Sequence, residues 1–351
     1  MGFGEFESAE QLHDRACVEA PTSEASLRAL IAFHSERHEP QMLADHLAHL
    51  AAVLRARIAD QPTDGPAYRT LGLIAAHGST RLPLATRVAL EISHSLGSAT
   101  TADYELLATK PISEHITDDA LFSHSDQHDL RRLFQFFAPQ VAKAVGIELA
   151  VYGVSRRDRL RPTQPLALLA HEMADAHGLP DVDVYISPRL PYLMVAEPTS
   201  PPSLVLGTAI AAASVTTQRF AMGVALRLMA VHLSVPARLS HPRLAALASA
   251  LTKLVVPNVA LELDSETEMW LVKLEKLLGS VERAHPLVMS TDAPRPMQFA
   301  EDLQIAGLRA GVVASGSLIA GLVPIATSLD LAIPQLLTSQ TLRRTIGVLL
   351  G

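Results

Sequence analysis

Four histidines near the start of the chain have the spacing of metal ligands on helices. His34 and His38 are four residues apart and His46 and His49 are three apart, so each pair can share one helix face. If the two helices form an antiparallel hairpin, the four imidazoles could converge on one zinc ion, which takes four ligands in proteins. Histidines on a solvated helix face have the same spacing. A metal site here, and the metal-dependent hydrolase that it would support, stays open as an alternative.

A second metal motif is incomplete. His171 and Glu172 resemble the start of HExxH, in which two histidines four residues apart bind zinc and the glutamate activates water. The next histidine, His177, is six residues after His171, so the two do not lie on one helix face. We expect an amphipathic helix here.

The densest basic cluster consists of Arg156, Arg157, Arg159 and Arg161. Four arginines could bind an acidic protein or the acidic first half of this chain. A solvated turn has the same composition, because exposed ion pairs contribute little. We treat the four arginines as candidate partner-binding residues.

Composition excludes several other activities. One cysteine among 351 residues, Cys17, excludes an intrachain disulfide and a multi-cysteine zinc site. A net charge of −7 provides no general footprint for nucleic acid. The sequence also lacks GxSxG, GxxxxGK[ST] and GxGxxG, so we expect neither a serine hydrolase of that type nor a nucleotide cofactor.

The first twenty residues lack a basic start followed by an apolar run, so we expect no secretory signal and a cytoplasmic location. Residues 310–326 approach the length of a membrane span. The run is rich in Gly, Ala and Ser, contains Pro324, and lacks flanking aromatic or basic anchors. We predict a buried helix pair and no membrane insertion.

Amphipathic helices must position these side chains in the first part of the chain. The apolar periodicity and the turn residues predict helices at 26–38, 42–58, 67–77, 82–96 and 126–145, the last bent by Pro139. Helix pairs of roughly 30–40 residues resemble a tetratricopeptide-like array over residues 24–97. Tyr68, Leu71, Gly72 and Ala75 carry this resemblance. It implies a concave surface that holds a peptide or a protein.

The second part of the chain mixes strands with helices. We expect a strand at 147–154 and a small β-meander of three apolar runs, at 182–187, 191–197 and 203–208. The predicted helices are 165–177, 209–233, 240–254, 265–278, 297–327 with a break near Gly316, and 331–349.

Charge divides the chain in the same way. Residues 1–145 hold 19 of the 36 acidic and 12 of the 29 basic side chains, and the remainder is neutral overall. We therefore predict two domains: a helical repeat-like domain at 1–145 and an α+β domain at 146–351.

The segments VYGVSRRDRL, HGLPDVDVYIS, SLVLGT and RFAMGVALRLMAV, within residues 151–231, carry a second resemblance. They are similar to the C-terminal domain of bacterial tetratricopeptide-repeat proteins of unassigned function, which resembles a degenerate HtpX-like gluzincin peptidase. The resemblance covers about residues 146–330. It implies a helix that bears HExxH in active members and a later helix that supplies a third ligand.

On that pattern the chain has lost its catalytic groups. Val224 and Leu228 take the positions of the histidine ligands, and Ala225 takes that of the general base. Gln304 replaces the glutamate ligand, and Leu308 replaces the aspartate after it. A neutral amide and aliphatic side chains cannot hold or activate zinc. The resemblance thus implies a pseudo-peptidase whose former site is apolar core.

The sequence therefore predicts an α-rich α+β protein, with tetratricopeptide-like hairpins followed by a mostly helical domain with a small β-meander. We expect a non-catalytic protein-binding scaffold or assembly subunit, with no catalytic, cofactor-binding or metal residues. Its expected partners are other proteins or further copies of the chain, and not nucleic acid.

Overall fold

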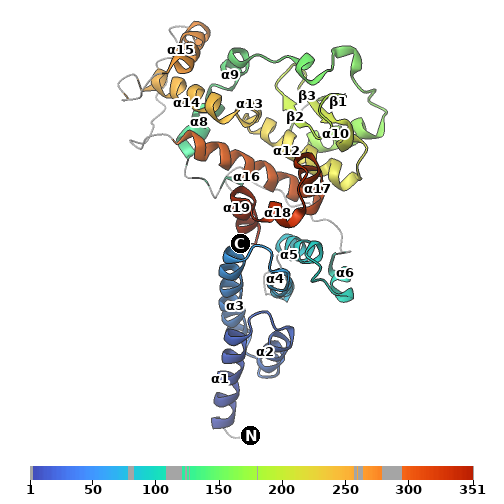
Figure 1. Ribbon diagram of the computed structural model, residues 1–351, viewed down its shortest axis with the longest axis vertical. Coiled ribbons are helices and arrows are strands. Elements are labelled where there is room, and N and C mark those ends of the chain that lie inside the picture. The colour runs from blue at the N-terminus through green and yellow to red at the C-terminus, as the bar shows by residue number, and fades with distance from the viewer. Residues whose placement is uncertain are drawn as a thin grey trace. The chain divides into compact units, whose positions relative to one another are not determined.

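The computed structural model describes residues 3–77, 83–107, 121–122, 125, 127–179, 181–256, 259, 264–278 and 295–350. This part of the chain is 71% helix, with 18 α-helices and one three-stranded mixed sheet (Figure 1). The predicted α-rich α+β class is confirmed. The same ranges contain no helix with both the length and the apolar character that crossing a bilayer requires.

Packing divides the chain into two compact units. The first comprises Met1–Ser113 and Gly316–Gly351, and the second comprises Glu114–Ser315. The boundary that the sequence predicts, after residue 145, lies inside the second unit. The C-terminal helices join the N-terminal helices through contacts between residues that are far apart in the sequence.

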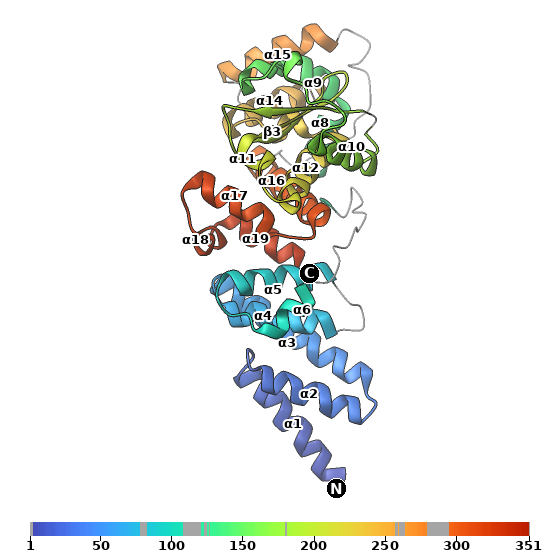
Figure 2. The ribbon, with the colours of Figure 1, turned by 90° about the vertical axis from the view of Figure 1, so that its right-hand side faces the viewer.

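Six helices of the first unit pack in chain order. They are α1 (Phe3–Glu19), α2 (Glu24–Glu36), α3 (Pro40–Asp60), α4 (Gly65–His77), α5 (Pro83–Ser95) and α6 (Thr101–Leu107). Each helix contacts the next, and Figure 2 shows α4, α5 and α6 lying beside one another. The four helices predicted within residues 26–96 are present, and α1 and α6 are additional.

Local sequence sets the ends of these helices. The Ser23 hydroxyl accepts a hydrogen bond from the Ser26 amide at 3.2 Å and begins α2. Pro40 occupies the first turn of α3, where no amide donor is needed. Asp64 accepts from the Ala67 amide at 3.0 Å and begins α4. His38, with φ of 57°, ends α2 in the left-handed conformation.

Three C-terminal helices complete the first unit: α17 (Ile319–Leu329), α18 (Ile333–Leu337) and α19 (Gln340–Leu349). Both α17 and α19 pack on α5. The Glu91 carboxylate of α5 accepts from the amides of Leu318 at 2.9 Å and Ile319 at 3.3 Å, at the start of α17. Burial raises the pKa of Glu91.

The second unit contains nine of the described α-helices: α8 (His128–Phe136), α9 (Ala138–Val145), α10 (Pro165–Ala176), α11 (Thr208–Ala211), α12 (Val215–Ala230), α13 (Ser234–Ala237), α14 (His241–Val255), α15 (Ser265–Leu278) and α16 (Pro296–Ser315). The helix predicted at 126–145 is two helices, because Pro139 lies in the first turn of α9 and begins a new helix. The apolar run at 310–326 is interrupted at Gly316, whose φ is 70°.

The predicted β-meander is wrong. The strands are β1 (Asp183–Ser187), β2 (Met194–Glu197) and β3 (Ser203–Gly207), and their order in the sheet is β1-β3-β2. The last strand lies in the centre, parallel to β1 and antiparallel to β2. All five residues of β3 are buried, which favours the central position.

The strand predicted at 147–154 is also wrong. Leu149–Tyr152 form a 3₁₀ turn, and Gly153 follows in the left-handed conformation with φ of 74°. The apolar composition of this segment reflects its packing, since Tyr152 and Val154 are buried against β-strand residues Tyr185 and Val205.

Two glycines allow α12 and α16 to pack closely in the second unit. A Cβ atom on Gly311 would lie 2.8 Å from Val224 Cγ2 and 2.9 Å from the Phe220 ring. A Cβ atom on Gly223 would clash with Ala314. A side chain at either glycine must therefore push the two helices apart.

We expect Gly311→Val to lower the free energy of unfolding of the second unit by about 3 kcal/mol, because overpacked cores force backbone shifts. Gly347→Ala in α19 is the matched control, since a Cβ atom there has nothing within 4 Å. It should raise stability by about 1 kcal/mol through helix propensity. Urea unfolding followed by circular dichroism measures both, and an unchanged midpoint for Gly311→Val would contradict the close packing.

Candidate protein-binding groove

An open apolar groove of about 480 Å³ lies in the first unit. One face of α3 forms its floor, and the lining residues there, Leu43, Leu47, Ala51 and Arg55, recur every four residues. Leu71, Ile74 and Ala75 of α4 line the groove as well, together with Pro40, Ala44, Ala48, His77, Ala85 and Leu350.

Helix α3 is longer than its neighbours, and the face that lines the groove is only partly exposed: Ala48 is exposed, whereas Leu47 and Ala51 are buried. The helix has 21 residues, whereas its neighbours α2 and α4 have 13 each. At 1.5 Å per residue, α3 is about 30 Å long and each neighbour about 20 Å, so neither can cover its whole length. The apolar periodicity of residues 42–58 predicts the helix but not which of its faces lines the groove.

The groove has a simple chemistry. Among the described residues that line it, Arg55 and His77 are the ionisable ones, and neither aspartate nor glutamate is present. Ala48 is exposed, so its methyl group forms part of the open floor. Such a surface fits an apolar segment with a negative charge at the Arg55 end.

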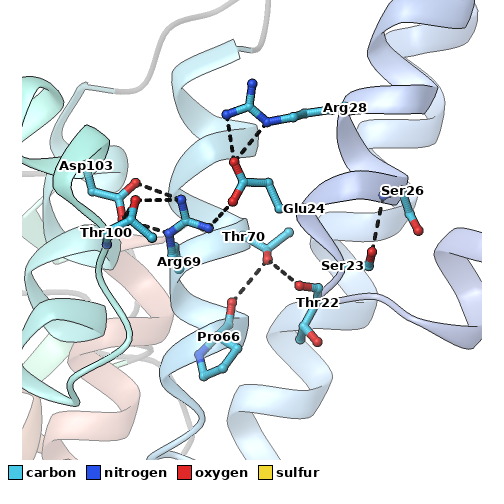
Figure 3. A network of polar contacts seen from close by, with 10 residues as sticks. All are labelled: Thr22, Ser23, Glu24, Ser26, Arg28, Pro66, Arg69, Thr70, Thr100 and Asp103. Atoms are coloured by element: carbon cyan, nitrogen blue, oxygen red, sulfur yellow. Dashed lines mark hydrogen bonds and ion pairs between the residues drawn. The ribbon is translucent and has the colours of Figure 1, made fainter.

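An arginine holds the α4 wall of the groove. Arg69 of α4 donates from Nε to Asp103 Oδ2 at 2.7 Å and from Nη2 to Asp103 Oδ1 at 3.1 Å (Figure 3). Its Nη1 donates to Glu24 of α2, and Nη2 also donates to Thr100 at 3.0 Å. One guanidinium therefore joins α2, α4 and α6.

The surroundings of the two carboxylates favour their charged forms. Hydrogen bonds from Arg69 and then from Arg28 lower the pKa of Glu24. Burial alone would raise the pKa of Asp103, but the hydrogen bonds from Arg69 and from the Thr100 amide outweigh it and lower the pKa. Asp103 is only 1% exposed, so without Arg69 its charge would be buried with no paired cation.

We expect Arg69→Met to lower the free energy of unfolding by roughly 2 to 3 kcal/mol at pH 7, because it leaves the buried carboxylate of Asp103 without its cation. The folded-state pKa values of Glu24 and Asp103 are lowered, so the stabilisation is present above their ordinary pKa values and is lost as the pH falls through the lowered ones. The difference from wild type should therefore shrink below about pH 4.

Arg28→Met is the control for this prediction. Arg28 pairs with Glu24 at 2.7 Å on the surface, with 73% of its side chain exposed, and its loss should cost less than about 1 kcal/mol. Denaturant titrations between pH 2 and 7 measure both variants. Equal effects of the two substitutions, or a difference that does not depend on pH, would contradict the role of Arg69.

The structure brings two of the four predicted histidine ligands together. The rings of His34 and His46 are stacked with centroids 4.9 Å apart. His34 is buried, and its Nδ1 lies 3.2 Å from Glu39 Oε2. His38 ends α2, and His49 lines a small cavity of about 210 Å³ with Cys17. In the described ranges no group of three or more His, Cys, Asp or Glu side chains could hold a metal ion.

The backbone gives a test of the role of His38. His38→Gly should raise the free energy of unfolding by about 1 kcal/mol, because glycine adopts the left-handed conformation without the steric cost that other residues bear. His49→Gly, inside α3, should lower it by about 1 kcal/mol. Zinc titration of both variants completes the test: a stoichiometric zinc site that both substitutions weaken would contradict the helix-cap role and support the hydrolase alternative.

All four arginines of the predicted partner-binding cluster are exposed in the second unit. Arg156 and Arg157 lie in a 3₁₀ turn in which Asp158 accepts from the Ser155 amide and hydroxyl, both at 2.8 Å. Arg159 donates to Asp183 at 2.9 Å, and the Arg161 amide donates to a glutamine side chain. Their role in partner binding stays a prediction.

The positions of the peptidase-like pattern fall on α12 and α16, which pack together. Ala225 and Leu228 are buried and Val224 is half-buried. Gly307 and Gly311 of α16 face Val224, whereas Gln304 is exposed. The glutamine that the resemblance places at the third ligand position is therefore not part of this contact.

Comparisons of the chain with protein-family models, curated proteins and solved structures give no match. The two family resemblances therefore stay predictions.

The second unit contains a group of interacting polar residues that no sequence motif indicates. Glu197, at the end of β2, is 1% exposed and accepts a hydrogen bond from the Tyr152 hydroxyl. Arg238 Nε lies 3.2 Å from the same carboxylate oxygen, and Arg238 Nη2 donates to the Gly146 carbonyl at 3.1 Å. Burial raises the pKa of Glu197. The group ties β2 to two loops, and its members are scattered along the sequence without a motif.

Proposed function

We propose that the protein is a non-catalytic binding scaffold or assembly subunit, and that the groove of the first unit holds its partner. The observation that supports the proposal is the open apolar groove along α3, closed on one side by α4 and bordered by Arg55, in which Ala48 is exposed and Leu43 is half-buried. Grooves between packed helices commonly bind an amphipathic helix through its apolar residues.

The partner that fits best is an amphipathic helical segment of another protein. Its apolar residues, spaced three or four apart, would lie on Leu43, Ala48 and Ala75, which are exposed or half-buried, and one acidic residue would pair with Arg55. The Arg55 guanidinium already donates to the Leu350 carbonyl at 3.3 and 2.9 Å. Because this contact holds the side chain in place, pairing with a partner carboxylate would cost less conformational entropy.

The second unit supports a binding role through the resemblance alone. If the peptidase-like alignment is correct, Val224, Ala225 and Leu228 stand where catalytic groups would be, and the domain is a pseudo-peptidase. The alternative, a metal-dependent hydrolase that uses His34, His38, His46 and His49, has weaker support, because His38 serves as a helix end and His34 interacts with Glu39.

A bulky residue on the groove floor tests this proposal. Peptides selected on the full-length protein from a random display library should bind Ala48→Trp at least about tenfold more weakly, because the indole occupies the groove. Ala48 is exposed, so the fold should tolerate the change. Ala56→Trp is the matched control, since Ala56 is an exposed alanine of the same helix outside the groove lining.

Fluorescence anisotropy with labelled peptides measures the affinities, and light scattering measures the mass. Equal binding to both tryptophan variants would contradict the groove as the binding site. A wild-type dimer that Ala48→Trp converts to a monomer would identify a second copy of the chain as the occupant, in place of another protein.

A further inference from the structure

A second cavity of the first unit has a different chemistry from the groove. It shares Arg55 and Leu350 with the groove, but α19 forms much of its wall. Its volume of about 420 Å³ lies within the range of small-molecule sites. The groove is apolar with one arginine, whereas this cavity combines apolar walls with three arginines.

The charged lining of the cavity has one sign. Arg55, Arg343 and Arg344 line it, and neither aspartate nor glutamate is among the described residues that do so. Arg55 donates to the Leu350 carbonyl through Nε and Nη2, and Arg343 donates to the Ala59 carbonyl through Nη2. A guanidinium has five N–H donors, so these bonds hold both side chains and leave donors for an anion.

Tyr68 adds a neutral donor to the lining. Burial raises the pKa of its phenol, although the nearby charge of Arg343 offsets part of the rise. The hydroxyl therefore stays protonated. Asp64, which also acts on Tyr68, has 6% of its side chain exposed, pairs with Arg57 and caps α4. Its charge is thus partly neutralised by a neighbour outside the cavity lining.

The remaining wall is apolar and has open space. Ile58 and Ile346 line it, and Gly347 of α19 faces a region in which an added Cβ atom would meet nothing within 4 Å. An aliphatic chain could lie over Gly347 without displacing protein atoms. The cavity thus offers oxyanion donors and an apolar surface in one volume.

We propose that this cavity binds a small amphiphilic anion, in which a carboxylate or phosphate monoester is joined to a short apolar stem. The oxyanion accepts hydrogen bonds from the arginines, and the stem lies against Ile346 and Gly347. This site overlaps the partner groove at Arg55 and Leu350, but its other lining residues differ, and the inference does not depend on the proposed function.

Isothermal titration of the full-length protein with octanoate, octyl phosphate and 1-octanol tests the proposal. At least one anion should bind, and 1-octanol should bind about tenfold more weakly or not at all, because it lacks the charge. The stronger of the two anions identifies the headgroup. If 1-octanol binds as well as the anions, or if wild type binds no anion, the proposal is overturned.

Substitutions locate the site. The double variant Arg343→Gln and Arg344→Gln should weaken anion binding about tenfold or more, while Arg28→Gln, an exposed change in α2, should have no effect beyond about twofold. Gly347→Leu should weaken binding by a similar factor because the side chain fills the cavity. Its Cβ has open space, so the fold should be retained, and Gly347→Ala controls for the backbone change.

Retained affinity in Gly347→Leu would place the anion elsewhere and overturn the proposal. The Ala48→Trp variant should bind the anions as wild type does, because Ala48 lines the groove and does not line the anion cavity. A failure of the anion site is therefore distinguishable from a failure of the peptide groove.

Discussion

The first unit depends on a partly buried ion network centred on one arginine. Helices that pack in chain order bury apolar faces between neighbours, but such contacts are non-directional and do not fix the register between helices. Arg69 adds direction, since its planar guanidinium binds Asp103 through two hydrogen bonds and Glu24 through a third (Figure 3). Because the three helices that it joins include the α4 wall, we expect this network to help fix the shape of the groove.

The sequence alone does not predict this network. Glu24 and Asp103 lie 45 and 34 residues from Arg69, and each belongs to an ordinary helix start when read locally. Nothing in the spacing indicates that all three converge. By contrast, the apolar periodicity of residues 42–58 is local, because it depends only on the 3.6-residue period, and the sequence therefore predicts α3, though not the face that forms the groove floor. It does not predict that Leu350 lies beside that floor.

The same difference between local and long-range signals explains why two predictions for the second unit, the β-meander and the strand at 147–154, are wrong. Three apolar runs separated by prolines predict three strands, and the strands are present. Their order depends on which strand is buried on both faces, and this is set by helices elsewhere in the chain, so β3 takes the centre. The segment around Tyr152 has strand composition but ends in a turn at Gly153. The glycines of α16 are visible in the sequence, but their contact with Val224 becomes clear only once α12 is placed against them.

We propose that the groove formed by α3 and α4 holds a partner segment. Amide hydrogen exchange of the full-length protein, with and without a saturating selected peptide, tests it most directly. We predict that exchange slows over residues 43–55 and 71–77, which carry the groove lining, and stays unchanged over residues 155–161. Slowed exchange confined to the arginine cluster at residues 156–161, with α3 and α4 unaffected, would contradict the account and move the binding site to the second unit.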